Sequence, residues 1–146
     1  MGAKISGKSD ANFAPLTIEG SPLHSTSHNS PVPSAQVKSA ILLAGLYAGG
    51  ETVATEPLLS RDHTERMLRL FGASITEQTE PNGRRHSIAI TGGQSLKSKN
   101  FSIPGDISAA SFFITASCIV PDSRITITNA GVNPTRTGIL KILVSS

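Results

Sequence analysis

The chain has 146 residues, of which 38% are hydrophobic, and a formal net charge of +3, which suits one or two small domains with a modest core. The basic residues are scattered and tryptophan is absent, so a nucleic-acid-binding face is not expected. No apolar run is long enough to cross a bilayer and no targeting signal opens the chain, so we expect a cytoplasmic protein without a membrane segment.

Hydrophobic periodicity and chain breakers predict strands and helices in alternation. Residues 1–20 look like the closing strands of a repeat, and a short strand then ends at Pro33. The run Pro81-Asn82-Gly83 predicts a hairpin turn. The elements predicted after Pro33 are a helix at 35–47, a strand at 51–56, a helix at 62–71, strands at 74–78 and 86–91, a helix at 107–119, a strand at 124–128 and a helix at 135–144.

These elements form an internal repeat with an offset of 71 residues. In this register Pro33 matches Pro104, and Leu68 matches Ile139. Each copy has the order βαβαββ, which predicts an α/β (α+β) fold built from repeat units. The chain holds about two repeats out of phase, because it begins at the end of one copy and stops inside another. We therefore expect it to be an internal piece of a longer repeat protein.

The start of the first helix is a candidate anion site. Ser34 follows Pro33 directly and is a natural N-cap. Backbone N–H groups of the first turn, together with the Ser34 hydroxyl and the Gln36 amide, can hold a phosphate or a carboxylate. A plain helix cap without a ligand is the alternative that these residues leave open.

The start of the second helix is another candidate. Asp62 suits the N-cap, and Glu65, three residues later, completes a capping-box pattern. Arg61 lies just outside the cap and can form a fork on an oxyanion. It can equally form an ion pair with Asp62 or Glu65, and the sequence leaves both possibilities open.

The remaining motifs favour structural roles. Asp106 is expected to cap the helix at 107–119, and Arg136 is expected to bind within the fold. Cys118, the only cysteine, lies in an apolar run and is expected to be buried. The four histidines show no ligand spacing supported by carboxylates, so neither a metal site nor a cofactor is expected.

Four segments that carry these residues resemble the 5-enolpyruvylshikimate-3-phosphate synthase (EPSP synthase) family. They follow the family's order and approximate spacing, and the resemblance covers nearly the whole chain. The motif Ser34-Ala35-Gln36, where other members have Ser-Ser-Gln, is similar to the motif of the bacterial branch called class II. The segments are PSAQVKSAILLAGL at 33–46, SRDHTERML at 60–68, PGDISAA at 104–110 and NPTRTG at 133–138.

The resemblance implies a reaction and a fold. Members of the family transfer the enolpyruvyl group of phosphoenolpyruvate to the 5-hydroxyl of shikimate 3-phosphate and release phosphate. This transferase step belongs to the shikimate pathway, which leads to chorismate and aromatic amino acids. The fold is a monomeric inside-out α/β barrel of two domains, each of three βαβαββ units, that close about a hinge. By this resemblance residues 1–93 belong to the first domain, 94–100 form the interdomain linker, and 101–146 begin the second domain.

The resemblance also implies roles for individual residues. Ser34, through its hydroxyl, and Ala35, through its backbone, match the segment that binds shikimate 3-phosphate. Gln36 matches the glutamine between shikimate 3-phosphate and phosphoenolpyruvate, and Arg61 matches a residue near the shikimate phosphate. The family's Lys-Ser…Arg group, phosphoenolpyruvate loop, proton-transferring acids and further arginines have no counterpart here, and Lys38 is not the catalytic lysine. We therefore expect no catalytic residue in this chain and no activity of the chain alone.

Two alternatives remain open. UDP-N-acetylglucosamine enolpyruvyl transferase has the same architecture but usually depends on a reactive cysteine loop, whereas Cys118 lies in a predicted apolar helix. A non-catalytic structural module that merely keeps the repeat is the other. Binding of shikimate 3-phosphate to the longer protein would separate these possibilities.

Overall fold

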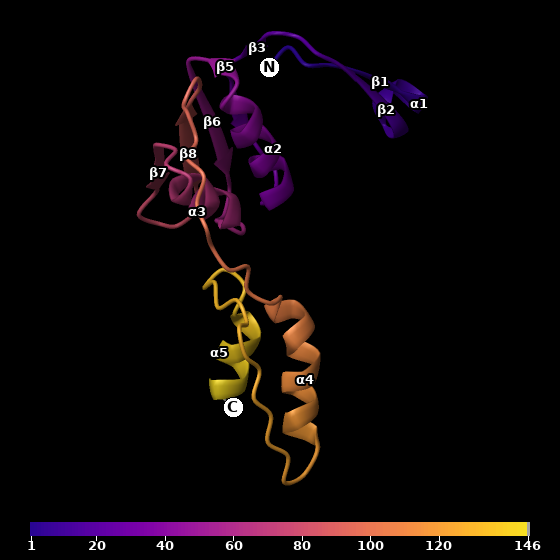
Figure 1. Cartoon of the computed structure of the whole chain (residues 1–146), viewed down its shortest axis with the longest axis vertical. Helices are drawn as coiled ribbons and strands as arrows, with labels where there is room; N and C mark the ends of the chain where they lie inside the picture. Colours follow the sequence, from indigo (N-terminus) through magenta and orange to yellow (C-terminus); the bar gives the residue numbers. More distant parts are fainter. Residues whose placement is uncertain (146) are drawn as a thin grey trace. The chain divides into compact units, whose positions relative to one another are not determined.

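The computed structural model describes residues 1–145 and forms two compact units, Met1–Lys99 and Asn100–Ser146. Figure 1 follows the chain through both units. None of the helices among the described residues is long and apolar enough to cross a membrane.

A four-stranded mixed sheet forms the framework of the first unit (Figure 1). Its strands are β4 (Ser27–Asn29), β6 (Glu51–Glu56), β7 (Ile75–Thr79) and β8 (His86–Thr91). The strand order is β4-β6-β8-β7, with β4 parallel to β6 and the other neighbours antiparallel. Strand β8 alternates buried His86, Ile88 and Ile90 with more exposed residues, which is the pattern of a sheet with one covered face.

Two helices, α2 (Ala35–Gly45) and α3 (His63–Leu70), pack on this sheet and build the core with it. Gly45 permits a close approach of α2, because a Cβ atom there would lie 2.8 Å from Ile90 Cγ2. The core residues are Leu42, Leu46, Leu68, Ala73, Ile88 and Ile90, with Ile75 packed against them. The core thus depends on both helices and on β8.

Apart from a two-residue strand at Ala48–Gly49, which pairs outside this sheet, the element order β4-α2-β6-α3-β7-β8 confirms the predicted βαβαββ unit. Because β4 and β6 run parallel, the helix after each strand begins at the same edge of the sheet. Strand β4 ends at Asn29, earlier than the predicted end at Pro33. The chain turns there, and Ser30 Oγ donates to the Val32 carbonyl at 2.6 Å.

The first residues form a separate hairpin, as the repeat predicts for the end of a copy. Strands β1 (Lys4–Gly7) and β2 (Phe13–Glu19) pair antiparallel. The segment α1 (Lys8–Ala11) between them is a turn rather than a helix, because Ser9 and Asp10 have positive φ. Two short strands, β3 (Leu23–His24) and β5 (Ala48–Gly49), pair in parallel beyond the hairpin.

The second unit contains the helices α4 (Ile107–Ile119) and α5 (Gly138–Ser145). Helix α4 has the predicted bounds, but the strand predicted at 124–128 is wrong. Within residues 100–145 no neighbouring strand offers hydrogen bonds to that segment, and the unit holds only the single bridge Gly105–Ala130. Helix α5 also begins later than predicted, because Asn133 Oδ1 holds Thr135 in a turn.

The surface of α4 is largely apolar. Phe112, Phe113 and Ile119 are exposed, and so is Cys118. The expectation that Cys118 is buried is therefore wrong, because residues 100–145 supply no second layer over this side of α4. A helix that is apolar on all sides is typical of the interior of a larger fold.

Candidate functional site

The start of α2 carries three of the residues selected from the sequence. Ser34 is the N-cap, and its Oγ accepts a hydrogen bond from the Val37 N–H at 3.3 Å. The Ser34 hydroxyl hydrogen remains able to donate, because the cap uses only a lone pair. Ala35 is half-buried and Gln36 is exposed. The helix cap and an anion site are therefore compatible at Ser34.

A narrow pocket adjoins this helix start. Ser34, Lys38 and Glu56 all line this pocket. The residues that line it come from the end of β4, from α2 and from β6, and they are His28, Ser30, Ser34, Val37, Lys38, Ile41, Ala54, Thr55 and Glu56. The polar side of the α2 start is thus connected to the end of the parallel strands.

Arg61 lies in the connection between β6 and α3, directly before the N-cap of α3. Its side chain is exposed and takes part in none of the ion pairs found within residues 1–145. The sequence left open an ion pair of Arg61 with Asp62 or Glu65. Neither of these ion pairs is found among the described residues. Arg61 and Ser34 make no direct contact, but they occupy the starts of two helices at one sheet edge.

The predicted capping box at α3 is wrong. Asp62 occupies the N-cap position but makes no side-chain capping hydrogen bond, and its Oδ2 accepts instead from Arg66 Nε at 2.8 Å. Glu65 points into the interior, where its side chain is completely shielded from solvent. The pattern misled because it ignores tertiary contacts: a buried cation attracts Glu65 away from the helix start.

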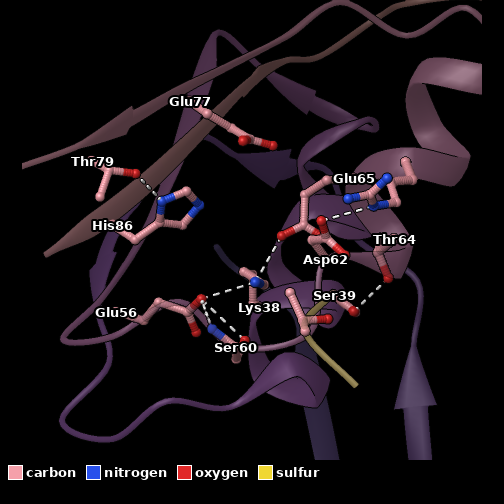
Figure 2. Close-up of polar contacts among 12 residues, drawn as sticks. Lys38, Ser39, Glu56, Ser60, Asp62, Thr64, Glu65, Glu77, Thr79 and His86 are labelled. Atoms are coloured by element: carbon pink, nitrogen blue, oxygen red, sulfur yellow. Dashed lines mark hydrogen bonds and ion pairs between the residues drawn. The ribbon is translucent and has the colours of Figure 1, made fainter. Parts of the chain in front are cut away.

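That cation is Lys38, to which the sequence analysis gave no structural role (Figure 2). Its Nζ lies 2.9 Å from Glu56 Oε1 and 2.7 Å from Glu65 Oε1. Only the Glu56 contact has hydrogen-bond geometry, so the Glu65 contact is an ion pair. The sequence holds a signal for the burial of Lys38 but not for its partners: Lys38 lies four residues before the buried Leu42 and so shares its helix face.

The hydrogen bonds of Glu56 explain how its charge is kept. Burial raises the pKa of Glu56, but hydrogen bonds from Lys38 and Ser60 and the Lys38 charge together outweigh burial and hold that pKa below its ordinary value. Glu56 Oε1 accepts from the Ser60 N–H at 2.8 Å and from the Ser60 hydroxyl at 3.0 Å. Glu56 is therefore an anion that ties α2 to the connection carrying Arg61.

Two further polar contacts surround this network. The Ser39 and Thr64 hydroxyls lie 2.6 Å apart and join α2 to α3 (Figure 2). His86, the register partner of Glu56 on β8, is buried with its Nδ1 2.7 Å from Thr79 Oγ1. These contacts fix the positions of α2, α3 and the hairpin from the polar side of the core.

The motifs of the second unit make internal contacts, in agreement with the structural interpretation. Asp106 Oδ1 accepts from the Ser108 N–H at 2.9 Å, which caps α4 and holds the pKa of Asp106 below its ordinary value. Arg136 Nη2 contacts the Ser108 hydroxyl and lies 3.7 Å from Asp106 Oδ1. Across the part of the chain that the structure describes, no group of three or more potential metal ligands gathers.

Comparisons with known proteins agree on one family. The model of the family described as EPSP synthase (3-phosphoshikimate 1-carboxyvinyltransferase) matches residues 1–145. The 3-phosphoshikimate 1-carboxyvinyltransferase of Citrifermentans bemidjiense is 56% identical over 143 residues, which are 98% of this chain and 32% of the relative. That of Pelobacter propionicus is 54% identical over 145 residues, 99% of this chain and again 32% of the relative.

Solved structures give the same result. An EPSP synthase structure from Acinetobacter baumannii matches with a TM-score of 0.82 and 44% sequence identity, over 99% of this chain and 32% of that chain. The chain thus spans about a third of the length of the proteins it matches. Their names correspond to the shikimate enzyme and not to the UDP-N-acetylglucosamine enzyme.

Proposed function

The chain belongs to the EPSP synthase family, and we propose that it forms part of an enzyme that transfers the enolpyruvyl group of phosphoenolpyruvate to shikimate 3-phosphate. The acceptor is the 5-hydroxyl, and phosphate is released. Within that enzyme the chain contributes part of the shikimate 3-phosphate site. The observation that carries this proposal is the common sheet edge at which α2 and α3 begin.

The chemistry of this edge suits a phosphate. The Ser34 hydroxyl and the backbone N–H groups at Ala35 and Gln36 supply donors at the positive end of the α2 dipole. Arg61 adds a planar guanidinium that can bind two phosphate oxygens at once. The Gln36 amide both donates and accepts, so it can lie between shikimate 3-phosphate and phosphoenolpyruvate.

The proposed contribution of this chain is binding and orientation, not proton transfer. Holding the acceptor in a fixed position lowers the entropic part of the barrier. We assign no catalytic residue and no cofactor to these residues. We further propose that this enzyme is cytoplasmic and monomeric, as the resemblance to the family implies, and the relatives that the chain matches come from bacteria.

A hybrid enzyme tests the proposal. In it, the matched segment of the Citrifermentans bemidjiense transferase is replaced by the 143 matched residues of this chain. We expect the hybrid to bind shikimate 3-phosphate and to release phosphate from phosphoenolpyruvate in its presence. The 146-residue chain alone should show no turnover under the same conditions.

Three results would contradict the proposal. One is a folded hybrid that does not bind shikimate 3-phosphate. The second is a hybrid that accepts UDP-N-acetylglucosamine in its place, which would favour the sister enzyme. The third is turnover by the isolated chain, because the catalytic groups would then have to lie within these residues.

A further inference from the structure

One carboxylate oxygen connects the two halves of the proposed phosphate site. Glu56 Oε1 accepts from Lys38 Nζ at 2.9 Å, from the Ser60 N–H at 2.8 Å and from the Ser60 hydroxyl at 3.0 Å. Lys38 lies one helical turn after Ser34, and Ser60 directly precedes Arg61. The buried oxygen is therefore linked to the α2 start on one side and to the backbone next to Arg61 on the other.

Apolar packing does little to hold the connection that carries Arg61. Leu58 and Leu59, the large apolar residues of this segment, are 56% and 49% exposed. The hydrogen bonds from Ser60 to Glu56 are therefore the main described attachment of the connection to the core. A segment with few buried apolar contacts depends on such polar attachments for its position.

The buried network of Lys38, Glu56 and Glu65 adds little net stability, because removing its charges from water costs free energy. Two carboxylates, Glu56 and Glu65, surround one ammonium group, and all three side chains are at most 3% exposed. Replacing a buried ion cluster with apolar side chains of similar size is often neutral or stabilising. What such a cluster provides is fixed geometry, because a buried anion must keep its donors within hydrogen-bond distance.

We propose that Glu56, held by Lys38, is a positioning residue that sets the place of Arg61 relative to the α2 start. Glu56 does not touch the substrate. It acts through Ser60 on the backbone of Arg61 and through Lys38 on the first turns of α2. This inference rests on the proposed function, in which Arg61 binds the phosphate of shikimate 3-phosphate.

The test compares shikimate 3-phosphate with shikimate, which lacks the phosphate, as ligands of the hybrid enzyme. Glu56→Gln keeps the size of the side chain but removes its charge. We expect this variant to bind shikimate 3-phosphate about tenfold more weakly, which is the equivalent of one charge-assisted contact. Its affinity for shikimate should be unchanged. Ser60→Ala leaves the buried ions intact and should weaken only the phosphorylated ligand, by a smaller factor.

Two further variants separate positioning from general destabilisation. Leu68→Ala removes a core side chain that is 3% exposed and lies outside the polar network, so it should change both affinities alike or neither. Arg61→Ala should reduce the preference for the phosphorylated ligand to what Ser34 and the start of α2 supply, and Glu56→Gln should add nothing further in that background.

The outcomes distinguish this inference from the proposed function. If Arg61→Ala weakens shikimate 3-phosphate while Glu56→Gln and Ser60→Ala keep the full preference for it, Glu56 is not a positioning residue. An equal loss of affinity for both ligands in Glu56→Gln would also rule out a positioning role for Glu56. If Arg61→Ala itself keeps the preference, Arg61 does not bind the phosphate and the proposed site is overturned.

Discussion

Glu65 Oε1 lies 2.7 Å from Lys38 Nζ, and both side chains are at most 3% exposed. This pair, together with Glu56, joins α2, α3 and the end of β6 through charges inside the first unit. Its members come from positions that look like ordinary surface residues of two helices in the sequence. Because these charges join three elements, they bear on the stability of the unit and on its response to pH.

Replacing Lys38 should be far more damaging than replacing an exposed cation of similar size. Lys38→Met leaves two buried carboxylates without their counter-ion, and we expect the free energy of unfolding to fall by about 3–5 kcal/mol. Arg66→Met is the matched control, because its ion pair with Asp62 is at the surface and is worth at most about 1 kcal/mol. Urea unfolding followed by circular dichroism measures both, and equal small losses would contradict the prediction.

The pKa of Glu56 predicts how stability depends on pH. Because the folded-state pKa is below the ordinary value of 4.5, the unfolded chain takes up this proton first as pH falls. The contribution is therefore fully present above about pH 4.5 and is lost as pH falls through the folded-state pKa. The slope from one such proton is at most about 1.4 kcal/mol per pH unit.

Glu56→Gln isolates this effect. The charged or titratable groups facing Glu56 are Lys38 on α2, Glu65 on α3 and His86 on β8, and they are present in both proteins. Their contributions are therefore largely shared when the slopes of the two proteins are compared. We expect the unfolding free energy of Glu56→Gln to depend less steeply on pH below 4.5. Parallel curves for the two proteins would show that Glu56 does not titrate in this way.

Binding of shikimate 3-phosphate should depend unequally on the residues at the two helix starts. In the hybrid enzyme, Arg61→Ala should weaken this ligand by about 1.5–3 kcal/mol, because a charge-assisted contact is lost. Ser34→Ala removes a neutral hydroxyl bond and should cost about 0.5–1.5 kcal/mol. Gln36→Ala should lower turnover as well as binding, since its amide would contact both substrates.

Arg124→Ala is the control for these titrations. Arg124 is exposed in the second unit and makes no ion pair among the described residues, so its loss should change binding little. Calorimetric titration measures the affinity of all four variants for shikimate 3-phosphate. Equal affinity of Arg61→Ala and the unsubstituted hybrid would remove Arg61 from the site.

Local patterns were sufficient where a helix has its own cap and where a predicted strand has neighbours to pair with. The strands at Glu51–Glu56 and His86–Thr91 have the predicted bounds because β-branched and alternating residues specify them. The helix at Ile107–Ile119 also has the predicted bounds, since Asp106 caps its start. The strand predicted at 124–128 failed because a strand needs a hydrogen-bonded neighbour, which local sequence cannot supply.

The residues of the candidate site also divide into those that the sequence could predict and those that it could not. Ser34 could be found because N-caps have a local signature, and its capping bond is present. The network of Lys38 with Glu56 and Glu65 could not, because its members are 9 to 27 residues apart and meet only when the sheet and both helices assemble. The prediction that Cys118 is buried was wrong for a related reason, because its burial depends on what covers α4 and not on the helix itself.

Gly92 should not tolerate a side chain. A Cβ atom at this position would lie 1.7 Å from the Ala48 carbonyl oxygen, a distance that only a backbone shift can relieve. We expect Gly92→Ala to destabilise the chain by about 1–3 kcal/mol or more, as in overpacked cores. Gly49→Ala is the matched control, because nothing lies within 4 Å of its added Cβ. Similar unfolding midpoints for the two variants would contradict the prediction.

The boundary between the two units should be the first site of proteolysis, and the contacts of residues 94–97 narrow its position. Gln94 bonds the Ser74 backbone through its amide at 2.7 and 3.0 Å. The Lys97 N–H donates to the Phe71 carbonyl at 2.8 Å, so the linker proposed at 94–100 is attached to the first unit up to that point. Lys99 lies at the division between the units. Because a protease needs a locally opened backbone, trypsin should cleave after Lys99 before it cleaves after Lys97.

Mass spectrometry of early digestion products measures this order directly. Gln94→Ala removes three hydrogen bonds of the attached segment but leaves the bond from the Lys97 N–H to Phe71, so it should make the chain more susceptible to cleavage after Lys97. Lys141→Ala is the control, because it removes a tryptic site in the second unit without touching this segment. Early cleavage at Arg61 or Arg69, with the bonds after Lys97 and Lys99 protected, would mean that the chain does not divide at 94–100. Such a result would place the weakest part of the fold inside the first unit, at α3 or the connection before it.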